Sequence, residues 1–376
     1  MPANNTPFLT VFFLFLGLLR FDSIPGLKAA TLASVPGVYV FGDSLVDAGN
    51  NNYLPFSLRK AILPPNGIDF PSKKPNGRFC NGKNAADIIA EKFGLPLPPP
   101  YLSLCLLRKR NARDVAAVKG VNFASAAAGI FDSNDQTTGQ AIPLSQQLNN
   151  WLSIHRNLRR KLGASEAKTH ISKSLFVIII GSNDILDYYN SLKLRKKSKP
   201  QQYMQSIANK FKEQLKRIHE TGTPRLLIFG VAPLGCAPQQ REKNSTIHEC
   251  NKEASMFASL YNEALTKMLQ ELKQELQSSM AYSYFDLFKS LQDINSNPER
   301  YGLADATSAC CGRGKLNADI PCVLPFARVC SDRTKYLFWD YYGHPTEAGA
   351  RVIVDLMFAN DSQYMFPLTL SQLVSP

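Results

Sequence analysis

The sequence predicts an α/β protein whose parallel β-sheet is covered by helices on both faces. Short apolar runs rich in β-branched residues recur along the chain, and longer amphipathic stretches separate them. The run Leu175–Ile180 (LFVIII) is apolar at every position, as expected for a strand that is buried on both faces of a parallel sheet. In the stretch Tyr203–Glu220, apolar residues recur at the spacing of one helix face. Alternation of these two kinds of segment is typical of α/β domains.

Each predicted strand is a short apolar run, and each predicted helix is a longer run with one apolar side. The predicted strands are Val38–Phe41, Gly120–Ala124, Leu175–Ile180, Leu226–Gly230 and Tyr282–Phe285. The predicted helices include Ala85–Phe93, Leu144–His155, Tyr203–Glu220, Glu249–Gln277 and Pro345–Phe358. No internal repeat or linker is visible, so we expect one domain over residues 34–370.

The N-terminus carries an apolar run, Phe8–Leu19, that is too short to span a bilayer comfortably as a helix. Pro25, Gly26 and several small residues follow it, as in the cleavage zone of a secretory signal peptide, although a basic segment before the run is missing. We therefore expect residues 1–30 to be a signal peptide, cleaved between about residues 28 and 33. The mature chain is expected to be secreted to the cell wall space without a transmembrane anchor. An uncleaved anchor or a buried helix is the alternative.

The chain has eight cysteines, an even number that favours disulfides in a secreted protein. No Cys-x-x-Cys pair or histidine cluster is present, which argues against a zinc site. We expect one pairing between Cys236 and Cys250 and others within residues 310–330, while the connectivity stays open. Asn244 and Asn360 begin glycosylation sequons.

The formal net charge is +13, and the basic residues cluster in three short segments. These segments are Arg108–Arg113, Arg156–Lys161 and Lys193–Lys199. Because no nucleic-acid recognition motif accompanies them, we interpret them as solvated loops or helix faces and expect no nucleic-acid partner. Weak attraction to an anionic wall polymer is the alternative.

Chemically useful residues follow the predicted strands, where ligands of open parallel sheets bind. Ser44 follows the first strand, the small-residue turn Ser125–Gly129 follows the second, and Asn183 follows the third. Near the C-terminus, Asp340 precedes His344 by four residues, a spacing that returns to one face of a helical turn. One rim of the sheet is therefore expected to hold a hydroxyl, an amide and a carboxylate–imidazole pair.

This set of residue types suits nucleophilic catalysis by serine. A serine hydroxyl needs a base to take its proton, and the base works best when a third group holds it, so His344 and Asp340 are the candidates. Backbone N–H groups of Ser44 and of the small-residue turn, together with the Asn183 amide, are candidate donors to an oxyanion. Each feature alone has a plainer interpretation: an Asp-x-x-x-His pair is usually a surface pair, and Gly-Asp-Ser can be a helix cap. Their order at successive strand ends favours catalysis.

Four segments resemble, in order, the sequence blocks of the GDSL esterase/lipases of the SGNH hydrolase superfamily, in particular the secreted plant branch. They are FGDSLVDAGNN, GVNFASAAAGI, GSNDILDYY and FWDYYGHPTEAG, and the resemblance covers roughly Val38 to Leu356. It implies a flavodoxin-like three-layer α/β/α sandwich with a five-stranded parallel sheet, and an enzyme without metal or cofactor. No Gly-x-Ser-x-Gly elbow occurs, which independently argues against the α/β-hydrolase fold.

The resemblance implies that Ser44 is the nucleophile, His344 the base and Asp340 its partner. It also implies an oxyanion hole made by Asn183 and the backbone N–H groups of Ser44 and Ala127. Two departures from the family pattern concern this site. The family usually has glycine at the position of Ala127, and alanine resists positive φ. The family usually separates its aspartate and histidine by two residues, whereas three residues, including Gly343, intervene here.

The leading expectation is a secreted serine ester hydrolase that cleaves esters of lipids or acylated wall polymers through an acyl-enzyme. Its substrate would be a small-molecule or polymer ester. An acyltransferase acting on a hydroxyl acceptor is one alternative, because the same three side chains would serve it. A weakly active protein that binds polysaccharide or a partner on the same fold is another. The sequence leaves the acyl and alcohol specificity and the oligomeric state open.

Overall fold

The computed structural model describes residues 34–106, 110–132, 139–222, 224–243 and 249–375. The predicted signal peptide, its cleavage region and the sequon at Asn244 lie outside these residues, so they stay predictions. Asn360 lies in an exposed turn, where a sequon would be accessible. None of the helices in the described ranges is long and apolar enough to cross a membrane.

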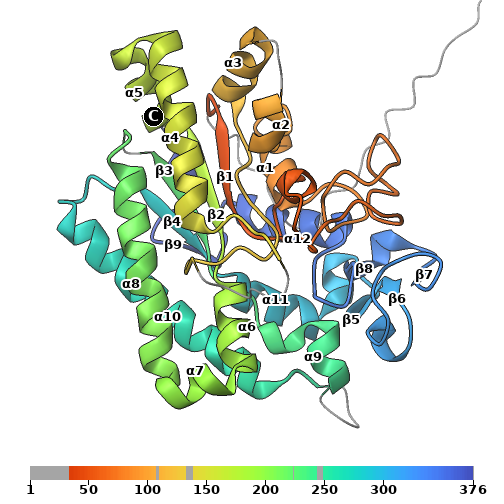
Figure 1. The fold of residues 1–376 in the computed structure, drawn as a ribbon. Coiled ribbons are helices and arrows are strands. Elements are labelled where there is room, and N and C mark those ends of the chain that lie inside the picture. Colours follow the sequence, from red (N-terminus) through yellow and green to blue (C-terminus); the bar gives the residue numbers. More distant parts are fainter. Residues whose placement is uncertain (1–33, 107–109, 133–138, 223, 244–248, 376) are drawn as a thin grey trace, which may run out of the picture.

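The fold is mixed α/β, built on a mostly parallel central sheet of order β1-β2-β3-β4-β9 (Figure 1). Its strands are β1 (Val38–Gly42), β2 (Leu175–Ile179), β3 (Arg225–Phe229), β4 (Tyr282–Phe285) and β9 (Met365–Phe366). The first four run parallel, and β9 pairs antiparallel with β4. Four strands of this sheet are therefore parallel, and its fifth strand, β9, is antiparallel and was not predicted. The chain reaches β9 from α12 by a short loop, which delivers it to the sheet edge in the opposite direction.

Residues 120–124, predicted as a strand, lie beside β1 but form no regular strand. They join it through a single parallel bridge between Val40 and Asn122. Their outer carbonyls bond to a side chain: the Asn50 amide donates to the carbonyls of Asn122 and Ala124, at 2.9 and 2.8 Å. Asn50 also accepts from the Leu102 N–H at 3.0 Å. The backbone at Pro100 also pairs with Asn122 on this side, so a single bridge and an amide side chain together take the place of a regular next strand.

Strand residues alternate between two apolar clusters, one on each face of the sheet. Phe176 and Ile178 of β2 belong to the first cluster, whereas Leu175 and Val177 belong to the second. Helices that cover the first face include α4 (Leu144–Leu162), α5 (Ala164–Lys173), α8 (Pro200–His219) and α10 (Lys252–Glu275). Helices that cover the second include α1 (Ala85–Lys92), α11 (Leu287–Ser296), α12 (Glu347–Phe358) and α13 (Leu370–Val374). The predicted cover of helices on both faces is present.

The remaining elements flank this core. They are α2 (Tyr101–Leu106), α3 (Arg110–Lys119), α6 (Ser182–Asn190), α7 (Leu192–Lys197), α9 (Pro238–Lys243), β5 (Asp305–Ala309), β6 (Cys311–Gly312), β7 (Arg328–Val329) and β8 (Tyr336–Phe338). The predicted helix from Pro345 begins two residues later, because Thr346 is the N-cap and its side chain accepts from the Gly349 N–H. The described parts of the basic segments lie mainly in solvent: Leu158 is the one buried residue of Arg156–Lys161.

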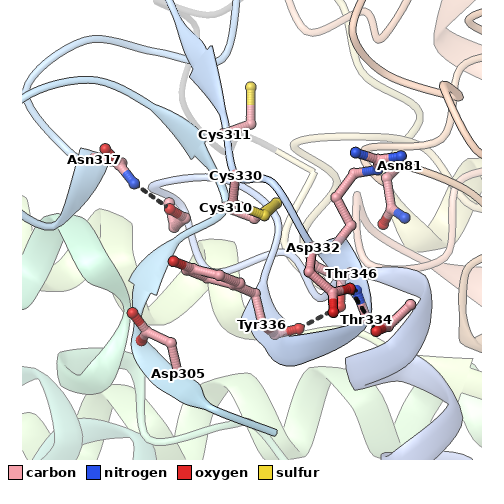
Figure 2. The surroundings of a disulfide bond; sticks show 12 residues. Asn81, Asp305, Cys310, Cys311, Asn317, Cys330, Asp332, Thr334, Tyr336 and Thr346 are labelled. Atoms are coloured by element: carbon pink, nitrogen blue, oxygen red, sulfur yellow. Dashed lines mark hydrogen bonds between the residues drawn. A yellow bond between two sulfur atoms is a disulfide. The ribbon is translucent and has the colours of Figure 1, made fainter.

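Three disulfides cross-link loops in the C-terminal half of the chain. The predicted Cys236–Cys250 pair is present, and the cysteines of residues 310–330 pair as Cys310–Cys330 and Cys311–Cys322. Figure 2 shows the Cys310–Cys330 bond beside Tyr336 of β8 and beside Thr346, whose hydroxyl donates to the Tyr336 carbonyl at 2.5 Å. This cysteine-rich region also contains a short pair of antiparallel strands, β6 and β7.

The side chain of Asn50 offers a test of the fold. Asn50→Ala removes three buried hydrogen bonds to residues 102, 122 and 124, so we expect the free energy of unfolding to fall by about 2–4 kcal/mol. Urea unfolding measures this change. Asn209→Ala, on the exposed side of α8, is the control and should change stability by less than about 0.5 kcal/mol. Equal effects of the two substitutions would contradict the prediction.

Candidate active site

The end of β1 is held so that Ser44 follows it at a defined place. The Gly42 N–H donates to the Gln147 side chain at 2.9 Å, and the Gln147 amide donates back to the Gly42 carbonyl at 2.8 Å. Gln147 is fully buried. A Cβ on Gly42 would lie 2.2 Å from the Ile179 carbonyl oxygen, so only glycine fits between the strands. Sequence reasoning missed Gln147, because a glutamine in the first turn of an amphipathic helix carries no distinguishing signal.

Asp340 and His344 lie on a tight loop between β8 and α12. The Trp339 N–H donates to the His344 carbonyl at 2.7 Å, which closes the loop, and Pro345 bridges to Phe338. Gly343 has a φ of +90°, a conformation that glycine adopts without strain. The expectation that the pair shares a helical turn is therefore wrong. The hairpin-like loop lets three residues intervene and still brings the carboxylate to the imidazole.

The structure brings Ser44, His344 and Asp340 into one hydrogen-bonded chain. The Ser44 Oγ and His344 Nε2 are 2.8 Å apart although 300 residues separate them, and His344 Nδ1 is 2.7 Å from Asp340 Oδ2. Asp340 and His344 are 6 and 7 % exposed. The Asp340 carboxylate accepts a hydrogen bond from the imidazole Nδ1–H, so Nε2 is left to accept from the serine hydroxyl. The Phe79 ring packs against the imidazole with centroids 5.1 Å apart.

The small-residue turn after residue 124 lies beside Ser44 and has the geometry that its alanine was expected to resist. Ala127 has a φ of +66°, in the left-handed region. The turn is held from two sides: Asp47 Oδ2 accepts from the Ala126 N–H at 3.1 Å, and Asn51 donates to the Ala126 carbonyl at 3.0 Å. The Asn183 amide donates to the Ala128 carbonyl at 2.9 Å. Buried polar side chains thus impose the conformation that alanine disfavours.

Ser44, Ala127, Asn183 and His344 all line one cavity of about 240 Å³. The cavity lies beyond the C-terminal ends of the parallel strands, where ligands of such sheets bind. Its walls are largely apolar and come from segments far apart in the sequence. They include Leu45, Phe79, Leu186, Leu234, Leu291 and Phe338.

Two buried carboxylates close to the serine were not singled out by the sequence. Burial raises the pKa of Asp43 to about 7, against the lowering effects of the Leu45 N–H bond and of the His344 charge, and repulsion by Asp184 adds to the rise. Burial likewise raises the pKa of Asp47 to about 6, although several backbone N–H groups donate to it. Both lie inside the motif that contains Ser44, where adjacent polar residues gave no sign of which side chain would be buried.

Ala127→Gly tests the strain in the turn. Glycine adopts positive φ freely, so we expect this substitution to leave the free energy of unfolding unchanged or to raise it by up to about 1 kcal/mol. Ala126→Gly is the matched control, because Ala126 does not have positive φ, and should lose roughly 0.5–1 kcal/mol. Thermal unfolding of both variants measures the difference. A larger loss for Ala127→Gly than for Ala126→Gly would contradict the proposed strain.

The raised pKa of Asp43 predicts that the stability of the fold depends on pH. Because folding raises its pKa to about 7, the folded state keeps a proton that the unfolded state releases near its ordinary value. The contribution of Asp43 to stability therefore falls as the pH rises from about 4 to about 7. Asp43→Asn should remove this decline and be the more stable chain at pH 8, by up to roughly 4 kcal/mol. If the free energy of unfolding of the unchanged chain and of the Asp43→Asn chain changed with pH in the same way, the prediction would be excluded.

Comparison with known proteins identifies the family of this chain. The sequence model of the family described as GDSL-like lipase/acylhydrolase matches residues 38–357. This range contains Ser44, Asn183, Asp340 and His344, and it spans the whole parallel part of the sheet.

Curated relatives match along almost the whole chain. GDSL esterase/lipase At5g55050 of Arabidopsis thaliana is 70% identical over the full length of both chains. GDSL esterase/lipase At4g16230 of the same plant is 36% identical over 91% of each chain. GDSL esterase/lipase 7, also from Arabidopsis thaliana, is 34% identical over 90% of this chain and 92% of its own. This chain therefore belongs to the GDSL-like lipase/acylhydrolase family.

Proposed function

We propose that this protein hydrolyses carboxylic esters, with Ser44 as the nucleophile, His344 as the general base and Asp340 as the group that holds the imidazole. The observation that supports the proposal most directly is the 2.8 Å contact between Ser44 Oγ and His344 Nε2. It forms across 300 residues of chain at the wall of a largely apolar cavity. A hydrogen bond that served only to stabilise the fold would not need a cavity beside it.

The proposed reaction runs through an acyl-enzyme. Ser44 Oγ attacks the ester carbonyl while its proton passes to His344 Nε2, and the resulting imidazolium is stabilised by Asp340 through Nδ1–H. The same proton then goes to the departing alcohol. A water molecule then attacks the acyl carbon while its proton passes to the neutral imidazole. The bond between the acyl carbon and Ser44 Oγ breaks, the imidazolium returns the proton to Oγ, and the acid is released. No step requires a metal or an organic cofactor.

The negative charge that develops on the carbonyl oxygen needs nearby donors. We assign this role to the backbone N–H groups of Ser44 and Ala127 and to the side-chain amide of Asn183, all of which line the cavity. One N–H of Asn183 is already bonded to the Ala128 carbonyl. That bond orients the amide and leaves its second N–H for substrate, since an amide nitrogen carries two hydrogens.

The substrate class follows from the cavity and from the relatives. Apolar walls suit an acyl chain, so esters of lipids or of acylated wall polymers are the proposed substrates. The relatives carry the names esterase and lipase, which favours release of the acyl group to water over its transfer to another hydroxyl.

The proposal also includes where the protein is located and how it is processed. Three disulfides support export to an oxidising compartment, and with it the signal peptide and the glycosylation of Asn244 and Asn360. Counting residues 120–124 as a reduced strand beside β1 would give the parallel order 2-1-3-4-5 of flavodoxin-like sheets. We propose that arrangement for this chain.

Ser44→Ala is the test of the mechanism. Removing the nucleophile should lower kcat for a soluble p-nitrophenyl ester by at least about 1,000-fold, while the folded structure is kept. Circular dichroism and thermal unfolding check the fold. Ser206→Ala, on the exposed side of α8, is the control and should keep the activity of the unchanged chain. Undiminished hydrolysis in the folded Ser44→Ala protein would refute the assignment.

A further inference from the structure

Large apolar side chains that lie in solvent are concentrated in one part of the molecule. Of the fourteen such side chains in the described residues, nine come from residues 53–68, from residues 324–326 and from Tyr342. Phe56 and Leu58 are 79 and 76 % exposed, and Phe326 is 64 % exposed. We call the set the mouth patch: Tyr53, Phe56, Leu58, Ile62, Leu63, Ile68, Leu324, Phe326 and Tyr342. Exposed apolar side chains gathered in this way mark interaction sites more often than scattered ones do.

The segments of the mouth patch meet beside the cavity. The Leu324 N–H lies 3.5 Å from the Pro64 carbonyl oxygen, which joins the first loop to the disulfide-bonded loop. The Arg59 guanidinium lies over the Tyr342 ring, 4.9 Å from its centroid, and both residues line the cavity. In Figure 1 the orange loops of this region lie next to the blue elements β6, β7 and β8. The patch therefore borders the opening that leads to Ser44.

The exposure of these side chains is set by a fixed backbone. The Asn51 amide donates to the hydroxyl of Ser57 and to the carbonyl of Arg59, at 3.1 and 2.9 Å. The Phe56 carbonyl accepts from the Gln140 N–H at 3.1 Å. Ser57 is buried between Phe56 and Leu58. Polar anchors thus hold the loop from inside, and its apolar side chains are presented outward.

The charges around the mouth patch are mostly positive. Arg59, Lys60, Lys73 and Lys74 belong to the same loop region, and Arg328 follows Phe326 in the second segment. Asp69 is the one acidic residue between residues 53 and 79, and it is paired with Arg333. A protein surface that combines exposed apolar side chains with neighbouring cations suits a lipid surface, where acyl chains lie beneath negatively charged head groups.

We propose that the mouth patch docks the protein on the surface of a negatively charged lipid aggregate, so that ester substrate enters the cavity from that surface. This inference rests on the proposed ester hydrolysis and names the physical state of its substrate. The apolar side chains would enter the acyl-chain region, and the cations would lie at the anionic head groups. A second copy of the chain would bring the same cations against one another, and this repulsion disfavours self-association through the patch.

Vesicle binding tests the proposal without requiring catalysis. The full chain carrying Ser44→Ala is mixed with phosphatidylcholine vesicles that contain phosphatidylglycerol, and the bound fraction is measured by sedimentation. We expect binding, and we expect Phe56→Ser with Leu58→Ser to weaken it by at least about tenfold, since each side chain loses an apolar environment. Lys73→Ala with Lys74→Ala should weaken binding severalfold and reduce its sensitivity to salt.

Matched controls lie elsewhere on the surface. Leu192→Ser removes a leucine that is 72 % exposed on α7, and Lys196→Ala with Lys197→Ala removes an exposed pair from the same helix. Both should bind vesicles like the Ser44→Ala chain. On a background with Ser44 intact, Phe56→Ser with Leu58→Ser should keep unchanged turnover of a soluble p-nitrophenyl ester, because neither residue lines the cavity.

Three outcomes would overturn the proposal. They are no binding to the anionic vesicles, equal binding with and without the Phe56 and Leu58 substitutions, and self-association of the chain that these substitutions abolish in the absence of lipid. Hydrolysis of the soluble ester decides the proposed function separately. If the Ser44→Ala chain with Phe56 and Leu58 intact does not bind the vesicles while the unchanged chain hydrolyses the soluble ester, the docking surface alone is refuted. Vesicle binding without any turnover by the unchanged chain refutes the enzymatic proposal.

Discussion

The hydrogen bond that closes the loop from Trp339 to His344 is the constraint on which the site depends. It turns the chain sharply between β8 and α12, so that the imidazole faces Ser44 and the Asp340 carboxylate lies behind it. The loop is itself attached to the disulfide-bonded region, because the N–H groups of Cys310 and Cys311 donate to the carbonyls of Phe338 and Trp339. The two disulfides of this region therefore help to keep His344 in position beside Ser44.

Ser44 is held in place by a different set of hydrogen bonds. The exit of β1 is clamped by Gln147, and the turn opposite is held by Asp47 and Asn51, so buried side-chain amides and carboxylates do what a further strand would do in a regular sheet. Such groups are costly to bury unless they are bonded, and most of them are bonded here. The Asn50 amide likewise bonds to the outer carbonyls of the irregular segment 120–124, beside the backbone bridge between Asn122 and Pro100.

The site also contains features that oppose stability. Asp43 is buried beside Ser44 with one carboxylate oxygen that has no hydrogen-bond partner in the described structure, and Ala127 has left-handed φ. Both lie within the segments that form the cavity wall. Strain and buried charge of this kind gather where a protein needs a defined geometry more than a low energy.

Much of this protein could be predicted from local sequence. Apolar periodicity indicated four of the five sheet strands and the helices on both faces, the cysteine spacing indicated the Cys236–Cys250 pair, and four ordered motifs indicated the family that comparison confirms. Each of these depends on residues close together in the chain. The antiparallel β9, the reduced strand at residues 120–124 and the loop that holds His344 could not be predicted, because each is decided by contacts between distant segments. The same holds for Gln147 and for the burial of Asp43. Whether a polar side chain is buried, and whether it has a hydrogen-bond partner there, depends on segments that only the tertiary structure brings beside it.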